Sequence, residues 1–387
     1  MSKVAIPKVL PKVISKVIGE GTYGCVHKPT LKCKRGKRNY THKISKIMSK
    51  RHAKEEMTEF KRMASIDANN QYHLGNPITC APKYNTEALA AIKKCEDGDK
   101  YIKDAALLIM EDGGLNLRQF ADKMANAPST KENQERMEAF WKEGRRMIVG
   151  IQELLEKKLI HHDLKPENVV YDEENHRMNL IDFGFLTRFS TIRKESAKSA
   201  NWLSQMHWSY PPEIQLFNKK EYMKYASKTD KEKVRFVKTI IKDMNLKKKN
   251  IYTDAFRAFF SYVIPASLSS QEYDKMASLY FYHFEQMMVS LKPAEYKNFI
   301  DEAITTIDIY GLGIAFMYVL NHTGHLISGD FKEGLEQLFR KMITSNVFER
   351  ISADDLLKSY DPLLENHVFM EKKGHQLRAH GYTPLNI

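Results

Sequence analysis

One segment, residues 161–170, constrains this chain more than any other part of its sequence. It reads His-His-Asp-Leu-Lys-Pro-Glu-Asn-Val-Val, and an Asp-Phe-Gly tripeptide begins at Asp182. Asp163, Lys165 and Asn168 therefore bring a carboxylate, a cation and an amide close together, and Asp182 adds a second carboxylate. Such a set can accept a hydroxyl proton, compensate phosphate charge and bind Mg²⁺, which is what phosphoryl transfer requires.

The two motifs together resemble the protein kinase superfamily, and specifically its serine/threonine branch. The resemblance implies that Asp163 is the catalytic base, that Lys165 steadies the γ-phosphate, and that Asn168 and Asp182 bind Mg²⁺. It also implies ATP as the phosphate donor, protein Ser/Thr hydroxyls as acceptors, and an α+β bilobal protein kinase fold with a β-rich N-lobe and a mostly helical C-lobe. A chance turn rich in charge would not reproduce both motifs at this spacing.

A glycine-rich segment follows a predicted strand near residues 13–18. Gly19, Gly21, Gly24 and Val26 form the pattern Gly-x-Gly-x-x-Gly-x-Val. Glycine lets the backbone approach phosphates closely. Dinucleotide-binding folds share the three glycines, but the trailing valine and the downstream motifs favour the nucleotide flap of a kinase, in which Val26 covers the adenine.

The next predicted strand should supply a lysine for the α- and β-phosphates. The family's Val-Ala-Ile-Lys is absent, so Lys43 and Lys46 are both candidates. The Ile-Ser-Lys-Ile-Met around Lys46 favours that residue and resembles kinases of nucleocytoplasmic large DNA (giant) viruses. A predicted helix near residues 50–67 should supply the glutamate partner, and Glu56 and Glu59 share one helical face.

The apolar residues 105–111 predict a buried strand that leads into the link between the lobes. By the resemblance, backbone groups of Glu111 and Gly113 bind the adenine edge, and Val170 covers the ring from below. The implied domains are a basic arm (1–13), an N-lobe (14–111), a C-lobe (112–364) and a tail (365–387). Residues 69–100 show no regular pattern and are expected to be irregular.

The chain departs from the family at His162, where most kinases have an arginine that pairs with an activation-loop phosphate. An imidazole near pH 7 is mostly neutral, so activity should not depend strictly on that phosphorylation. The threonine that normally precedes the end of the activation segment is also missing, with Met206 near its place. Glu213 should pair with Arg350.

A second departure follows Glu213. Asp308 matches the residue that braces the catalytic loop, so residues 214–305 are expected to form a large helical insertion in the C-lobe. Apolar residues recur at helical spacing over 273–291 and predict a core-facing helix. A docking surface for a substrate or partner is the alternative for this segment.

Charge, apolar stretches and cysteines bear on partners, membrane insertion and metal sites. The net charge is +13, and residues 32–54 contain many basic residues and no acidic one. This basic N-lobe could attract an acidic partner or nucleic acid. The longest apolar stretch, around residues 309–320, is too short to span a membrane, so no membrane insertion is expected. Four cysteines without Cys-x-x-Cys spacing (Cys25, Cys33, Cys80, Cys95) are expected to be reduced thiols rather than a zinc site or disulfides.

The sequence therefore predicts a cytoplasmic serine/threonine protein kinase, with host cytoplasm or virion as its location if it is viral. One alternative is a pseudokinase scaffold, which the complete set of phosphate and metal residues disfavours. Another is a small-molecule or lipid kinase, which generally lacks Lys-Pro-Glu in this loop. The substrate and the oligomeric state do not follow from the sequence.

Overall fold

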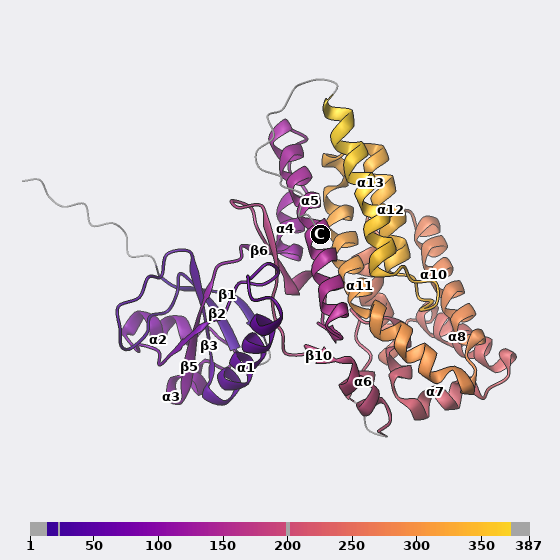
Figure 1. The fold of residues 1–387 in the computed structure, drawn as a ribbon, viewed down its shortest axis with the longest axis horizontal. Helices are drawn as coiled ribbons and strands as arrows, with labels where there is room; N and C mark the ends of the chain where they lie inside the picture. The colour runs from indigo at the N-terminus through magenta and orange to yellow at the C-terminus, as the bar shows by residue number, and fades with distance from the viewer. Residues whose placement is uncertain (1–13, 22–23, 199–201, 373–387) are drawn as a thin grey trace, which may run out of the picture. The chain divides into compact units, whose positions relative to one another are not determined.

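The computed structural model describes residues 14–21, 24–198 and 202–372 (Figure 1). It divides into two compact units, Met1–Gly113 and Gly114–Ile387. The predicted boundary between residues 111 and 112 lies two residues before this division. The predicted basic arm, the tip of the glycine-rich segment and most of the predicted tail lie outside the described residues.

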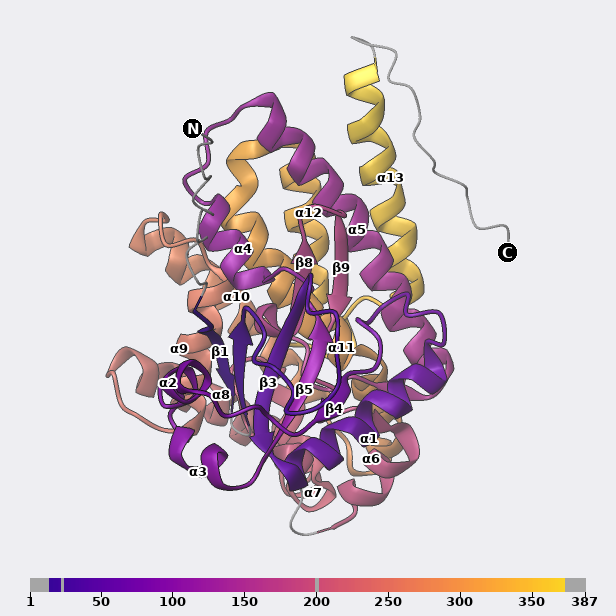
Figure 2. The ribbon, with the colours of Figure 1, turned by 90° about the vertical axis from the view of Figure 1, so that its left-hand side faces the viewer.

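A five-stranded antiparallel sheet forms the centre of the first unit. Figure 2 labels β1, β3, β5 and β4 in this order across the sheet, with β2 between β1 and β3. In spatial order the strands are β1 (Lys16–Gly21), β2 (Gly24–Lys28), β3 (Lys43–Ser49), β5 (Ala105–Glu111) and β4 (Ile78–Cys80). The helices of this unit are α1 (Lys50–Ile66), α2 (Thr86–Ile92) and α3 (Gly98–Lys103).

Both faces of this sheet are covered, which explains why β5 is a continuous apolar run. Leu107 and Ile109 point to one face, where they join a cluster with residues of α2 and α3. Ala106 and Leu108 point to the other face and pack with Ala53 of α1. Because side chains alternate along a strand, a strand buried on both faces has no room for polar positions.

Two sequence predictions for the first unit are wrong. Residues 69–100 are not irregular throughout, since they contain β4, α2 and the start of α3. The cysteines are not free thiols, because Cys25 pairs with Cys95 and Cys33 pairs with Cys80 as disulfides. The paired residues are 70 and 47 positions apart, so local cysteine spacing carries no sign of them. All four lie in or against the cluster under α2.

The second unit is mostly helical. Its short strands form a three-stranded sheet in the order β6 (Leu115–Asn116), β8 (Val169–Asp172) and β9 (Arg177–Leu180), and a pair of β7 (Leu159–Ile160) with β10 (Thr187–Arg188). Its α-helices are α4 (Leu117–Met124), α5 (Lys131–Glu156), α6 (Phe189–Ser196), α7 (Lys219–Ala226), α8 (Asp230–Asn245), α9 (Ile251–Val263), α10 (Ser270–Ser290), α11 (Tyr296–Thr323), α12 (Gly329–Met342) and α13 (Ala353–Lys372).

The core of the second unit is built around α11. Its residues are buried on every side over most of its length, which is typical of a central helix in a large protein. By length and composition the stretch Pro293–Leu326 could cross a membrane, contrary to the expectation from the sequence, but 89% of its apolar window is buried inside the protein. Its apolar character is thus accounted for by packing against α4, α5, α9 and α12.

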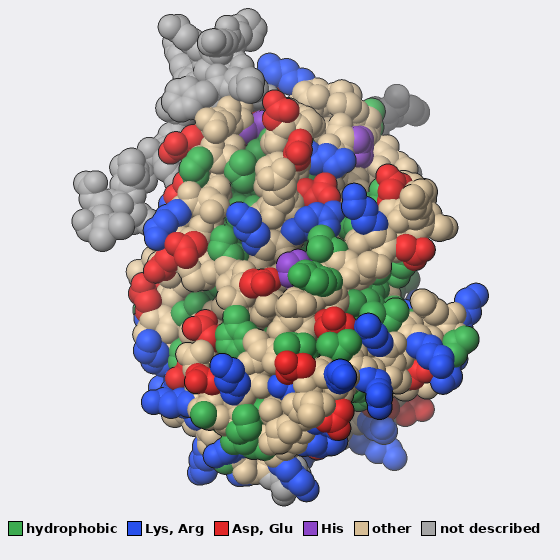
Figure 3. Space-filling view, turned by 90° about the vertical axis from the view of Figure 1, so that its right-hand side faces the viewer, with side chains coloured by type: hydrophobic (Ala, Val, Ile, Leu, Met, Phe, Trp, Pro, Cys, Tyr) green, Lys and Arg blue, Asp and Glu red, His purple; other side chains and the backbone are tan. Residues whose placement is uncertain are grey.

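The helices α7 to α10 occupy most of the predicted insertion. The predicted core-facing helix is α10, in which Phe284, Met287 and Met288 are buried as expected, and Phe281 is buried as well. Leu279 is the exception, with 52% of its surface exposed. Over the face seen in Figure 3, basic and acidic side chains are interspersed, so the positive net charge does not gather there.

Candidate active site

Asp163 lies in the loop between β7 and β8, and other side chains of that loop hold its carboxylate. Lys165 Nζ lies 3.0 and 2.8 Å from the two carboxylate oxygens. Asn168 Nδ2 donates to the backbone carbonyl of Asp163 and to its Oδ2, both at 2.8 Å. The short 3-10 helix Pro166–Asn168 turns Asn168 back toward Asp163. The three residues predicted from the sequence thus form one connected group, in which Asp163 is only 6% exposed.

Asp308 fixes the backbone of this loop, as predicted. It lies on α11 with 1% of its surface exposed, and its carboxylate accepts the backbone N–H groups of His161 at 2.6 Å and His162 at 2.8 Å. Burial raises the pKa of the Asp308 carboxyl, while His161 and the two backbone bonds oppose that shift. The carboxylate therefore stays buried because the loop backbone supplies its hydrogen bonds.

His161 connects the loop to the strand that precedes Asp182. The backbone N–H of Asp163 lies 3.4 Å from His161 Nδ1, and Nε2 lies 3.1 Å from the carbonyl oxygen of Ile181. If Nδ1 accepts, Nε2 carries the proton and donates to that carbonyl. The ring is fully buried, so His161 is a structural residue of this loop.

Asp182 lies just after β9, at a positive φ of 63°. Its exposed carboxylate accepts the N–H of Gly184 at 3.4 Å, and Phe183 is buried with its ring 5.5 Å from that of His161. The backbone N–H of Ile181 also donates to the Asn168 carbonyl at 3.0 Å. Asn168 and Asp182 offer an amide oxygen and a carboxylate, the hard oxygen donors that Mg²⁺ prefers, so the residues present fit that ion.

In the first unit, the structure pairs Lys46 with Glu56. Lys46 Nζ lies 2.7 Å from Glu56 Oε2, and both side chains are about one-fifth exposed. Lys43 forms its ion pair with Glu111 on the neighbouring strand β5 instead. The geometry therefore favours Lys46 and Glu56 among the alternatives that the sequence leaves open. Glu59 lies on the same helix α1 and takes no part in this pair.

The remaining nucleotide candidates of the first unit lie along β1, β2 and the end of β5. Gly19 and Gly21 are on β1, and Gly24 and Val26 are on β2. A Cβ on Gly24 would lie 2.9 Å from the carbonyl oxygen of Ile47, closer than real Cβ contacts, so the packing of β2 on β3 requires glycine there. Gly113 is buried just after β5.

Val170, the candidate for the lower cover of the adenine ring, lies on β8 of the second unit and is buried.

A model of the protein kinase domain matches residues 13–360 of the chain. The chain belongs to the protein kinase family. It is also similar to "Putative ribosomal protein S6 kinase alpha-2" of Caenorhabditis elegans, with 31% identity over 64 residues, which is 16% of this chain and 8% of that protein. The match thus spans a small fraction of the relative's length.

The end of the kinase activation segment is held by a buried ion pair. Glu213 Oε1 and Arg350 Nη1 lie 2.7 Å apart, and neither side chain is exposed. Arg350 also donates to Thr306 Oγ1 at 3.2 Å and to the carbonyl of Thr344, and its guanidinium lies 4.9 Å from the centre of the Tyr310 ring. This confirms the predicted pair and shows that the arginine has partners on several sides.

His162 is buried at the position where most kinases carry an arginine. Only 2% of its surface is exposed, its φ is 67°, and its ring packs against Tyr210 at 5.2 Å and Phe185 at 6.3 Å. Burial, with a smaller contribution from His161, lowers the pKa of His162 to about 3. The residue is therefore neutral at physiological pH.

His207 is a candidate that the sequence did not indicate. It follows Met206, near the place of the missing threonine, and its Nδ1 lies 2.8 Å from Ser209 Oγ. Its pKa is lowered by partial desolvation and then by the Lys165 ammonium, whereas Asp163 and Glu167 act in the opposite direction. The charges of the catalytic loop thus act on the His207 imidazole.

The insertion also reaches the catalytic loop, through Tyr262 of α9. The Tyr262 hydroxyl lies 2.8 Å from Glu167 Oε1, and Arg118 Nη1 lies 3.3 Å from the same oxygen and 3.0 Å from that hydroxyl. Trp208 of the activation segment stacks on the Tyr262 ring, with centroids 3.9 Å apart and planes 17° apart. Neither Arg118 nor Tyr262 belongs to a sequence motif, so only the fold reveals them.

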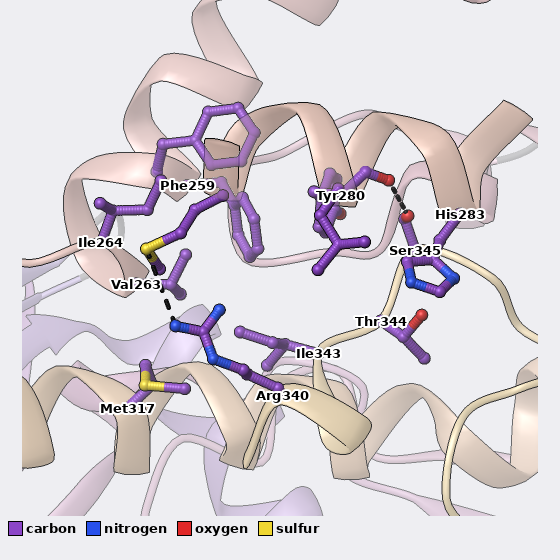
Figure 4. Close-up of a pocket in the computed structure, with 13 residues that line it drawn as sticks. Phe259, Val263, Ile264, Tyr280, His283, Met317, Arg340, Ile343, Thr344 and Ser345 are labelled. Carbon is purple, nitrogen blue, oxygen red and sulfur yellow. Dashed lines mark hydrogen bonds between the residues drawn. The ribbon is translucent and has the colours of Figure 1, made fainter. Parts of the chain in front are cut away.

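A pocket in the second unit lies among α9, α10, α11 and α12 (Figure 4). Phe259, Val263 and Ile264 line it from α9 and its end, Met317 from α11, and Arg340 from α12. None of its lining residues belongs to the catalytic loop or to the Asp-Phe-Gly segment, so this pocket is not the site of phosphoryl transfer. The Arg340 guanidinium within it is paired with Glu336 on its own helix.

Proposed function

We propose that this kinase transfers the γ-phosphate of ATP to serine and threonine hydroxyls of protein substrates. The observation that carries the proposal is the connected group of Asp163, Lys165 and Asn168, in which a nearly buried carboxylate is oriented by an ammonium and an amide. The Lys165 in that group, two positions after Asp163, is the residue that the serine/threonine branch carries.

The chain's own residues would contribute mainly positioning and charge. Asp163 would orient the substrate hydroxyl and accept its proton, and Lys165 would turn from Asp163 toward the γ-phosphate oxygens. Lys46, held by Glu56, would bind the α- and β-phosphates. Asn168 and Asp182 would bind Mg²⁺, which when present neutralises phosphate charge.

We also propose that activity does not require phosphorylation of the activation segment. His162 supports this proposal because it is neutral, buried and packed against aromatic rings, so it offers no charge to a phosphate. The unphosphorylated recombinant protein should therefore phosphorylate a generic substrate. An inactive protein that gains activity only after treatment with an upstream kinase would contradict this.

We further propose kinship with kinases of nucleocytoplasmic large DNA viruses and, from that kinship, a location in the host cytoplasm or the virion. The support for the kinship is the Ile-Ser-Lys-Ile-Met segment of β3 and the position of the insertion after Glu213. An acidic partner or nucleic acid is a second candidate ligand, favoured by five exposed basic residues, Lys32, Lys34, Arg35, Lys37 and Arg38. Salt-dependent binding to a DNA duplex would test it.

The experiment that tests the main proposal compares wild type with Asp163→Asn in radiolabelled phosphate transfer to a protein or peptide mixture. Loss of a general base costs about 10²–10⁴-fold, so turnover should fall by at least that range while Mg·ATP binding, measured by thermal shift, stays nearly unchanged. Asp274→Asn, an exposed position on α10, controls for loss of a negative charge.

The outcomes separate the alternatives. Wild-type turnover by Asp163→Asn would refute its role as the base. A wild-type protein that binds Mg·ATP but transfers no phosphate would be a pseudokinase scaffold. Transfer to lipid or small-molecule acceptors and not to protein would indicate the other enzyme class, and phosphate on tyrosine alone would contradict the serine/threonine assignment.

A further inference from the structure

Two buried sulfurs and a buried imidazole converge in the first unit. Cys25 and His27 lie on β2, and Cys95 follows α2. His27 Nε2 lies 3.5 Å from Cys25 Sγ and 3.4 Å from Cys95 Sγ. Cys25 and His27 are fully buried and Cys95 is 5% exposed. Three donor atoms that favour soft metal ions thus share one small volume within 4.8 Å of one another.

Two of the three distances between these donor atoms match those of a tetrahedral zinc site. With Zn–S near 2.3 Å and Zn–N near 2.05 Å, a tetrahedral ion separates a nitrogen and a sulfur ligand by roughly 3.5 Å and two sulfur ligands by roughly 3.8 Å. Both nitrogen–sulfur distances already have this value. Only the two sulfurs are closer than a metal would hold them, because a covalent bond joins them.

The surroundings supply the supporting contacts that such a site needs. His27 Nδ1, the other ring nitrogen, lies 3.5 Å from Ser15 Oγ, which can hold the ring orientation. Glu20 is the cross-strand partner of Cys25, and its Oε1 accepts the backbone N–H of Glu96 at 2.6 Å, next to Cys95. The Glu20 carboxylate therefore lies next to the segment that carries Cys95, although the ligand group itself contains only the two sulfurs and the imidazole.

We propose that Cys25, His27 and Cys95 form a zinc site that the disulfide keeps closed. A dithiol reductant opens it: the dithiol gives up two electrons and two protons, its own sulfurs form a disulfide, and Cys25 and Cys95 become thiols. Zn²⁺ then binds both sulfurs and His27 Nε2, and the two thiol protons are released to solvent. In either state a link ties β2 to the segment after α2.

The second disulfide offers a matched control within the same unit. Cys33–Cys80 lies in the same buried region, but in the described part of the chain no third His, Cys, Asp or Glu joins it in a ligand cluster. A general affinity of reduced protein thiols for metal would involve both pairs. A specific zinc site would involve only Cys25 and Cys95, the pair beside His27.

The test is metal titration of the full-length protein before and after anaerobic reduction, with the reductant removed. The oxidised wild type should show no thiolate-to-cobalt charge-transfer band when Co²⁺ is added. The reduced protein should bind one Co²⁺ per chain, with thiolate-to-cobalt charge-transfer absorption and tetrahedral ligand-field bands that Zn²⁺ abolishes by displacement. His27→Ala should weaken binding at least as much as loss of a second-sphere partner does, about 10–100-fold.

The variants decide which pair is responsible. Cys25→Ser/Cys95→Ser should remove the charge-transfer band, whereas Cys33→Ser/Cys80→Ser should keep it. A reduced wild type without the band, a band that survives in Cys25→Ser/Cys95→Ser, or affinity unchanged in His27→Ala would each overturn the proposal. The comparison of oxidised with reduced wild type decides the matter even if a variant fails to fold, and no step of it depends on kinase activity.

Discussion

The contact between Asp308 and the catalytic loop gives the sharpest test of how this fold supports its chemistry. In Asp308→Asn, one oxygen can still accept one of the two backbone N–H groups, from His161 or His162. The other N–H then faces an amide NH₂, which is also a donor. The substitution thus keeps size and shape but removes one charge-assisted hydrogen bond and leaves a buried donor without an acceptor.

The expected cost follows from the two distances of 2.6 and 2.8 Å and from burial. Losing a hydrogen bond to a charged group and stranding its donor costs about 2–4 kcal/mol in total. Burial raises the pKa of Asp308, so the native carboxylate itself carries a desolvation cost that a neutral amide avoids. The net loss in the free energy of unfolding should be about 1–3 kcal/mol.

The loop that Asp308 holds contains Asp163, so turnover should fall further than stability. A displacement of about 1 Å at a reacting group can cost about 10²-fold, and kcat should fall on that scale. Urea denaturation gives the stability and steady-state phosphate transfer gives kcat. Asp301→Asn, on the same helix, removes a partly exposed ion pair with Arg193 and should cost no more than about 1 kcal/mol. Wild-type stability and turnover in Asp308→Asn would refute the role assigned to its carboxylate.

Three further predictions test other parts of the structure. Lys46→Met should lower kcat/KM for ATP by ~10²-fold or more, while Lys43→Met should change it by less than ~3-fold; steady-state kinetics with the reverse order would reassign the phosphate lysine. His162 has a folded pKa of about 3 against the usual 6.5, so the unfolded chain takes up the proton first and stability falls as the pH drops below about 6.5. Between pH 7.5 and 5 the wild type should lose ~2 kcal/mol more than His162→Gln, and equal losses in urea titrations would contradict this. Tyr262→Phe should lower turnover of protein substrates by ~3–10-fold, because it removes one hydrogen bond to the catalytic-loop glutamate; a change confined to KM for ATP would speak against this coupling.

The catalytic group was predictable because its chemistry demands particular residues at short, fixed spacing along the chain. Asp163, Lys165 and Asn168 lie in one loop, so the contacts among them are local in sequence. The choice between Glu56 and Glu59 was not predictable, since both lie on the same helical face and only the contact with Lys46 distinguishes them.

The parts that could not be predicted are those formed by contacts distant in sequence. Cys25 and Cys95 meet only because α2 and the segment after it fold over one face of the sheet. Tyr262 reaches Glu167 across 95 positions, and no local pattern marks either residue for that role. The expectation of reduced cysteines failed for the same reason: spacing within a motif says nothing about thiols brought together by packing.

The aromatic packing of the insertion bears on how such a segment is inherited. Phe259 of α9 stacks on Tyr310 of α11, and the hydroxyl of Tyr280 on α10 is hydrogen-bonded to that of Tyr310 at 2.7 Å. Tyr310 also lies against Arg350, the partner of Glu213. A protein of this lineage that lost α9 and α10 would expose apolar side chains along one flank of α11. Stepwise deletion of the insertion would therefore pass through unstable intermediate proteins. The segment should therefore persist or vanish as a block among descendants of this gene.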